Sequence, residues 1–175
     1  MHVKHLIIIM GVSGCGKTTI AKHIAENTSF KYMESDQFHS QENKRHMQSG
    51  RPLTDDMRWP WINDICAAIE NEPHDIVLAN SGLKRFHRAR FLELDRVCNF
   101  IHLHVPQAII QTRMDARVNH FMPTSLLDSQ FSDMEPALPN EPIFNIDAQG
   151  SLSEVTAASL ARVEDILRLK QIKKL

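Results

Sequence analysis

The feature that most constrains this chain lies near its start. Residues 11–18 read Gly-Val-Ser-Gly-Cys-Gly-Lys-Thr, which is the pattern G-x-x-x-x-G-K-T. The apolar run Leu6–Met10 before it predicts a buried parallel strand, and Thr18–Ala25 after it has apolar residues at helical spacing. A strand, a glycine-containing turn and a helix in this order are the context in which the pattern binds phosphate, so we favour that function over a chance match.

The residue types explain why such a loop binds phosphate. Glycines let the backbone turn so that successive N–H groups point inward, and the following helix adds partial positive charge at its N-terminus. We expect Lys17 to reach the β- and γ-phosphates and the Thr18 hydroxyl to coordinate Mg²⁺, whereas Cys15 is interpreted as a spacer. The predicted nucleotide-binding residues of the loop are Gly11, Val12, Ser13, Gly14, Cys15, Gly16, Lys17, Thr18 and Thr19.

Composition excludes several classes of protein. Twenty Lys and Arg against 21 Asp and Glu give a formal charge of −1, so no nucleic-acid surface is expected. The three cysteines are widely spaced and form no metal or disulfide framework, which is typical of a reducing compartment. The N-terminus leads directly into the first strand, and no apolar run approaches membrane-spanning length. We therefore expect a cytoplasmic protein with neither a membrane nor a nucleic-acid partner.

Asp36 follows the second predicted strand, which covers Phe30–Ser35. Ligands of an open α/β sheet lie beyond the carboxyl ends of its strands, so Asp36 is expected beside Lys17 and Thr18. A carboxylate there could accept a proton from a substrate hydroxyl or hold Mg²⁺ through water. The alternative is a helix N-cap, which we favour less because a charge beside a phosphate loop is rarely without a function.

The rest of the chain continues the alternation of strands and helices. The predicted elements are a helix over 38–49, a helix from Thr54–Asp55, strand 75–80, a basic helix over 84–90, strand 99–105, a helix from Pro106, strand 143–147, and a last helix opened by the capping box Ser151–Glu154. The third strand ends without an aspartate, so it supplies no Walker B carboxylate. The predicted fold class is a single α/β domain over 1–175, a three-layer α/β/α arrangement with a five-stranded parallel sheet.

Two arginines and a proline-rich segment complete the expected phosphate site. Arg113 and Arg117 lie four residues apart, outside the stripe expected to be buried, where they suit neutralisation of a triphosphate; the alternative is a surface pair. Residues 119–142 hold four prolines around a short helical patch over 125–131, which predicts a closing lid. These features favour a small-molecule phosphotransferase. A GTPase would need an Asn-Lys-x-Asp motif, and an AAA-type ATPase would need more chain and a Walker B acid.

Longer blocks of sequence then resemble the gluconokinase family over nearly the whole chain. The most specific are Gly50-x-Pro52-Leu53-x-Asp55-Asp56-x-Arg58-x-Pro60-Trp61 and His120-Phe121-Met122-Pro123 followed by Ser129-Gln130-Phe131. The resemblance implies ATP-dependent phosphorylation of D-gluconate at its 6-hydroxyl, with Mg²⁺ and a homodimer. It implies Asp36 as the base, with Lys17 and Arg117, aided by Arg113, stabilising the transferred phosphoryl group. The substrate contacts that it implies are Asp36, His39, Arg58, Lys84, Arg88 and His120.

The chain departs from this family after the third strand. The family usually has Cys-Ser-Ala-Leu-Lys and then Tyr-Arg-Asp, where this chain has Asn80-Ser81-Gly82-Leu83-Lys84 and His87-Arg88-Ala89. Asn80 is expected to bring an amide to the pocket floor, and Ala89 removes a carboxylate. A related sugar acid is therefore an alternative substrate. Two rival functions are a shikimate- or nucleotide-kinase-like enzyme and a non-catalytic nucleotide-binding regulator.

Overall fold

The computed structural model describes residues 3–116 and 126–172, with side chains through residue 168. Within these ranges one parallel sheet contains five strands: β1 (His5–Met10), β2 (Lys31–Glu34), β3 (Ile76–Ala79), β4 (Val97–His104) and β5 (Ile143–Asp147). Their spatial order is β2-β3-β1-β4-β5, with Ile8 of β1 in register with Leu78 and Phe100. The predicted fold class is confirmed.

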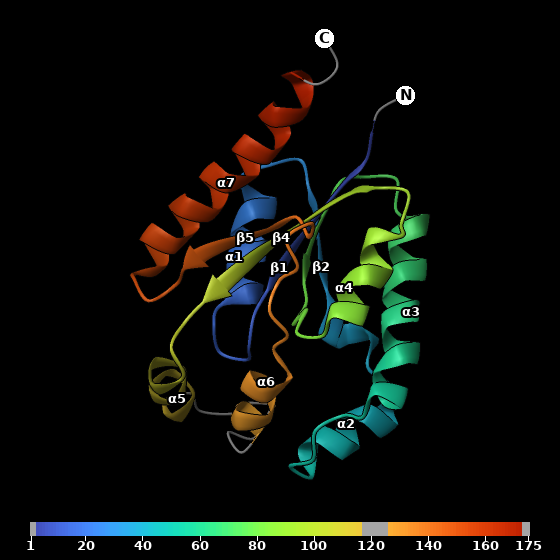
Figure 1. Cartoon of the computed structure of the whole chain (residues 1–175), viewed down its shortest axis with the longest axis vertical. Coiled ribbons are helices and arrows are strands. Elements are labelled where there is room, and N and C mark those ends of the chain that lie inside the picture. The colour runs from blue at the N-terminus through green and yellow to red at the C-terminus, as the bar shows by residue number, and fades with distance from the viewer. Residues whose placement is uncertain (1–2, 117–125, 173–175) are drawn as a thin grey trace.

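Helices cover both faces of the sheet (Figure 1). Helices α1 (Lys17–Glu26) and α7 (Leu152–Ile172) lie on one face, and α3 (Asp55–Asn71) and α4 (Arg85–Leu92) lie on the other. Alternate residues of β1 enter different cores: Ile7 and Ile9 pack with α1 and α7, whereas Ile8 packs with α3. Because successive side chains of a strand point to opposite faces, only a continuous apolar run can be buried on both sides.

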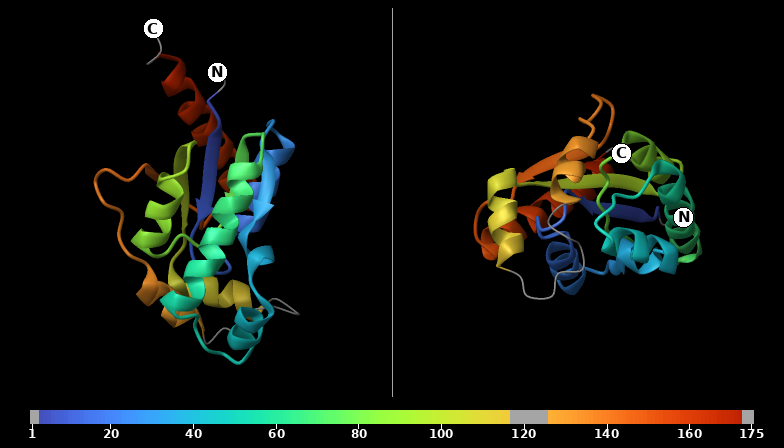
Figure 2. Two further views of the ribbon diagram at one scale, coloured as in Figure 1. Left: turned by 90° about the vertical axis from the view of Figure 1, so that its right-hand side faces the viewer. Right: turned by 90° about the horizontal axis from the view of Figure 1, so that it is seen from below.

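Several short helices gather where the strands end. These are η1 (Ser35–Phe38), α2 (Gln41–Gln48), α5 (Gln107–Asp115) and α6 (Leu127–Asp133), at the lower end of the molecule in Figure 1 and seen from below in Figure 2. Strand β1 lies between β3 and β4: the chain first forms β2 and β3 on one side of it and then crosses to form β4 and β5 on the other. A crevice at the carboxyl end of such a strand is the expected ligand site.

Local capping explains where the predicted boundaries were right and wrong. The prediction of one helix over 38–49 is wrong, because the Ser40 hydroxyl accepts from the N–H of Asn43 and starts α2 separately from η1. Pro106 is the N-cap of α5 and not its first residue. The capping box is confirmed, since Ser151 and Glu154 exchange hydrogen bonds of 2.8 and 3.3 Å.

The described part of the predicted lid contains α6, two residues further along the chain than the expected helical patch. The lid residues before 126 lie outside the described residues, so lid closure stays a prediction. Among the described residues, every helix is too short or too polar to cross a bilayer.

Candidate active site

The phosphate loop connects β1 to α1 through backbone conformations that favour glycine. Gly11, Gly14 and Gly16 all have positive φ, at 144°, 83° and 104°. A Cβ atom on Gly11 would lie 2.8 Å from the sulfur of Cys15 and 3.0 Å from the carbonyl of Leu103, so both conformation and space require glycine. Cys15 is itself buried, and its sulfur packs inside the loop in agreement with the spacer interpretation.

The N-terminus of α1 is open, unlike those of α2 and α3. Ser40 and Thr54 cap α2 and α3 with their side chains, whereas α1 follows Gly16 with no side-chain cap and no acid in its first turn. Its first N–H groups and its helix dipole are therefore available to an anion. Lys17 folds over the same loop, with its Nζ atom 3.0 Å from the carbonyl oxygen of Val12.

A second acid, missed in the sequence analysis, lies at the end of β2. The Thr18 hydroxyl donates to Oε2 of Glu34 at 2.6 Å, and the Tyr32 hydroxyl donates to the same oxygen at 2.7 Å. Burial first, and then Glu34, raise the pKa of Tyr32, so its hydroxyl stays a protonated donor at neutral pH. The strand-end argument that selected Asp36 applies equally to Glu34, two residues earlier.

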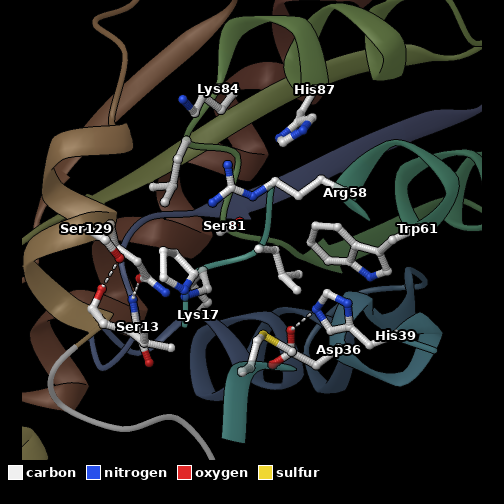
Figure 3. A pocket seen from close by; sticks show the side chains of 16 residues that line it. Ser13, Lys17, Asp36, His39, Arg58, Trp61, Ser81, Lys84, His87 and Ser129 are labelled. Carbon is white, nitrogen blue, oxygen red and sulfur yellow. Dashed lines mark hydrogen bonds and ion pairs between the residues drawn. The ribbon is translucent and has the colours of Figure 1, made fainter. Parts of the chain in front are cut away.

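A pocket joins the phosphate loop to the opposite helical layer (Figure 3). Ser13 and Lys17 of the loop lie at one side, Asp36 and His39 lie below, and Arg58, Lys84 and His87 lie at the far side. The full lining is Ser13, Lys17, Asp36, His39, Met47, Pro52, Leu53, Arg58, Trp61, Ser81, Leu83, Lys84, His87, Leu126, Ser129 and Gln130. The pocket thus brings together six of the site residues predicted from sequence, which come from separate segments of the chain: Ser13, Lys17, Asp36, His39, Arg58 and Lys84.

Asp36 lies beside a buried pair of aromatic rings. Its side chain is 68% exposed, and its Oδ1 lies 3.8 Å from Nε2 of His39. The His39 ring stacks on Trp61 with centroids 4.2 Å apart, and the Trp61 indole N–H donates to the carbonyl of Ser35 at 2.8 Å. Burial, and secondarily Lys44, lower the pKa of His39 to about 4, so a neutral imidazole faces the Asp36 carboxylate at neutral pH.

Two cations at the far side of the pocket share one carboxylate that the sequence analysis missed. Arg58 donates to Oδ2 of Asp133 at 2.6 Å, and Nζ of Lys84 lies 3.1 Å from Oδ1 of the same residue. Asp55 also accepts from Arg58, at 3.1 Å. Burial opposes ionisation of Asp133, but hydrogen bonds from Lys84 and Arg58 outweigh it and lower its pKa on balance. No local spacing could reveal this contact, because Asp133 comes from α6.

Arg88 does not lie in the pocket, which corrects its predicted role as a substrate contact. It is fully buried, with Nε and Nη2 donating to the two carboxylate oxygens of Glu141 at 2.7 and 3.0 Å. Its Nη1 donates to the carbonyls of Gly82 and Leu83. Its donor groups therefore fasten α4 both to the turn after β3 and to the segment before β5.

Asn80 also differs from its expected place. Its side chain is buried behind the pocket, and its Oδ1 accepts from the N–H of Gly82 at 2.8 Å. The amide folds back on its own turn because Gly82, at φ 60°, presents that N–H to it. Ser81 and Leu83 of this turn line the pocket instead.

Arg113 lies on the other side of the phosphate loop. Its Nη2 donates to the carbonyl of Ala148 at 2.9 Å and closes a second hollow. That hollow is lined by Gly14, Cys15, Gly16, Thr19, Ile20, Arg113, Ala148, Gly150, Leu152 and Val155. Arg117 and His120, the other predicted residues of the lid region, lie outside the described residues.

Gln130 of α6 reaches back to the phosphate loop. Its Oε1 accepts from the backbone N–H of Ser13 at 2.6 Å. The same helix also carries Asp133, so α6 contacts both the loop and the two cations at the far side. One short helix therefore connects both ends of the pocket.

Comparison with known proteins agrees with this geometry. A family model described as an AAA domain matches residues 6–138, although β3 ends without an acid. The chain is 34% identical to the gluconokinase of Gluconobacter oxydans, covering 82% of each, and 31% identical to the thermoresistant gluconokinase of Escherichia coli, covering 91% and 93%.

Solved structures point the same way. A gluconokinase from Sinorhizobium meliloti superposes with a TM-score of 0.83 at 34% identity, covering 97% of this chain and 99% of that one. A sugar kinase from Janibacter superposes with a TM-score of 0.88 at 36% identity, covering 92% and 95%. Fold, phosphate loop and sequence identity over most of each relative's length together show that this chain belongs to the AAA domain family and to the gluconokinase family.

Proposed function

We propose that this chain is a gluconokinase, which transfers the γ-phosphoryl group of ATP to the 6-hydroxyl of D-gluconate. The observation that carries the proposal is the arrangement of one pocket. The phosphate loop and Asp36 lie at one part of it, and Arg58 and Lys84 lie at the other. A sugar acid has the matching arrangement, with an alcohol at one end and a carboxylate at the other. Arginine suits the carboxylate because it can donate to both oxygens.

In this proposal each residue acts through position and charge. Asp36 orients the acceptor hydroxyl and takes its proton as the oxygen bonds to the γ-phosphorus, while the bond to ADP breaks. Lys17 and the free N–H groups at the start of α1 stabilise the charge on the transferred group. Arg117 and Arg113 are proposed to assist them. Closure of residues 119–142 would exclude water, so that ATP is not hydrolysed.

The residues at the end of β2 fit a magnesium ion. Thr18 supplies a hydroxyl, and Glu34 and Asp36 supply carboxylates, which are the hard oxygen ligands that Mg²⁺ prefers. Among the described residues no cluster of three His, Cys, Asp or Glu could hold a metal ion alone. We therefore propose that Mg²⁺ binds as its nucleotide complex, with Thr18 as the direct ligand. When bound, the ion would neutralise phosphate charge.

The hollow beside Arg113 is the proposed place of the adenosine part of ATP. It adjoins Gly14, Gly16 and Thr19 on the side of the loop away from the acceptor pocket. Leu152 and Val155 give it an apolar wall, which suits a purine ring.

We further propose a cytoplasmic homodimer. Cys15, Cys66 and Cys98 are buried and form no disulfide, which supports a reducing compartment. The exposed apolar side chains Trp59, Leu92 and Leu138 support a contact between subunits. Light scattering coupled to size-exclusion chromatography tests the dimer, and a monomeric mass at micromolar concentration would contradict it.

The function is tested by measuring ADP release with ATP and Mg²⁺ across a panel of sugar acids, with phosphate position on the product assigned by ³¹P NMR. Gluconate is expected to give the highest kcat/KM and a 6-phosphate product. A related sugar acid clearly exceeding gluconate would favour the alternative substrate. Transfer to no member of the panel would exclude the proposal and favour a nucleotide-binding regulator.

A further inference from the structure

His87 is a buried polar side chain that takes no part in the proposed phosphoryl transfer. It lies on α4 with 3% of its surface exposed, and it lines the pocket beside Arg58 and Lys84. Its Nε2 atom is buried and has no hydrogen-bond partner among the described residues. Phe86 packs against the ring in an edge contact, with centroids 4.0 Å apart, and fixes its orientation.

Buried nitrogens without a hydrogen-bond partner among the described residues also occur at His39, Asn80 and Asn99, so the nitrogen of His87 is informative because the ring also lines the pocket beside two cations. Leaving such a group without a hydrogen bond costs about 1–3 kcal/mol, which an apolar side chain would avoid. His102 shows the contrast, since its Nδ1 is paired with Oδ1 of Asn145 at 2.9 Å. The unpartnered Nε2 atom of His87 therefore indicates a hydrogen-bonding partner that enters with the substrate.

The charge state of His87 defines the class of that partner. Burial first, and then the positive charge of Arg58, lower the pKa of His87 to about 4. At neutral pH the ring is uncharged and offers one N–H donor and one acceptor nitrogen. It therefore suits a hydroxyl group, which can donate or accept, whereas the neighbouring cations Arg58 and Lys84 suit the carboxylate.

We propose that His87 determines substrate specificity by hydrogen-bonding, through Nε2, the hydroxyl on the carbon next to the carboxylate of the sugar acid. This hydroxyl is the one expected to reach His87, because Arg58 and Lys84, which bind the carboxylate, lie beside His87 in the pocket. This inference rests on the proposed function. It makes the pocket selective for 2-hydroxy acids over analogues that lack that hydroxyl.

The test compares gluconate with 2-deoxygluconate in the wild type, in His87→Phe and in His87→Gln. In the wild type, gluconate is expected to exceed the 2-deoxy compound about 10- to 100-fold in kcat/KM, which corresponds to one buried hydrogen bond. His87→Phe is expected to raise KM for gluconate by that factor, with kcat and the 2-deoxy kinetics nearly unchanged. His87→Gln, which keeps a donor and an acceptor, should recover part of the preference.

His5→Phe is the matched control, because His5 lies at the end of β1 away from the phosphate loop. This variant should leave kcat and KM for both substrates unchanged. If His87→Phe does not fold, ¹⁵N NMR of the wild type replaces it: gluconate should shift the His87 Nε2 resonance and 2-deoxygluconate should not. A preference that survives His87→Phe, or equal shifts with both compounds, would overturn the inference. Transfer to no sugar acid at all would instead show that the proposed function fails.

Discussion

The two ends of the pocket are built in different ways. The phosphate-binding end is continuous in sequence, with residues 11–19 supplying the loop, the lysine and the open N-terminus of α1. The acceptor end is assembled from η1, α3, α4 and α6, and its central ion pair joins residues 75 positions apart. One end is therefore a local conformation of the backbone, and the other exists only when separate helices have packed.

The largest effect is expected where the two ends meet, at Asp36. Asp36→Asn keeps the size of the side chain but removes the base, so kcat for gluconate should fall about 10²- to 10⁴-fold. ATP binding, measured by calorimetry, should change less than about twofold, because the phosphate loop is unaltered. Asp165→Asn, on the exposed surface of α7, is the control. Unchanged turnover in Asp36→Asn would remove Asp36 from the proposed mechanism.

Substitution of Arg88 tests whether a buried ion pair outside the pocket stabilises the fold that carries the acceptor end. Arg88→Met removes one partner of the buried pair with Glu141 and leaves a carboxylate uncompensated, which should lower the free energy of unfolding by about 3–5 kcal/mol. Denaturant titration measures this change. The double variant Arg88→Met with Glu141→Leu should recover much of the loss. A single variant as stable as the wild type would show that the pair does not hold α4 in place.

Lowering the pH should reduce the free energy of unfolding, because two buried histidines at the acceptor end must then take up protons. The pKa values of His39 and His87 are lowered to about 4 in the folded protein, below the ordinary value of 6.5. The unfolded chain therefore binds protons first, and stability present above pH 6.5 is lost as the pH falls towards 4, by about 3 kcal/mol per histidine.

Denaturant titration at pH 7, 5.5 and 4.5 measures this loss of stability. The double variant His39→Gln with His87→Gln should show a flatter dependence on pH than the wild type. Asp133 and Glu141 remain in that variant, and their lowered pKa values also favour the folded state at neutral pH, so some slope should persist. An identical pH dependence in the variant and the wild type would contradict the assignment to the histidines.

The smallest effect is expected at Asp133, which occupies the donors that a substrate carboxylate would use. Asp133→Asn should lower KM for gluconate about 3- to 10-fold, because Arg58 and Lys84 no longer share their charge with an internal acid. The same change should destabilise the fold by about 1 kcal/mol, since two nearby cations lose their counter-ion. A raised KM would instead show that Asp133 holds the cations in position for the substrate.

Much of this architecture was predictable, for an identifiable reason. The apolar run of β1 and the stripe of α1 are local signals, and the Ser151–Glu154 capping box lies within one turn of helix. Asp36 was predictable because strand ends converge at one edge of a parallel sheet. The break between η1 and α2 was missed because the Ser40 hydroxyl competes with continuation of the helix.

By itself, the sequence determined the phosphate-binding end, since nine consecutive residues carry both the conformation and the donors. Only the tertiary structure decided the acceptor end. It turned Arg88 away from the pocket and placed Asp133 between Arg58 and Lys84. It also left Nε2 of His87, a residue that lines the pocket, without a hydrogen-bond partner among the described residues. The physical reason is that backbone dihedrals depend on neighbouring residues, whereas the direction and partner of a long charged side chain depend on which helices pack against it.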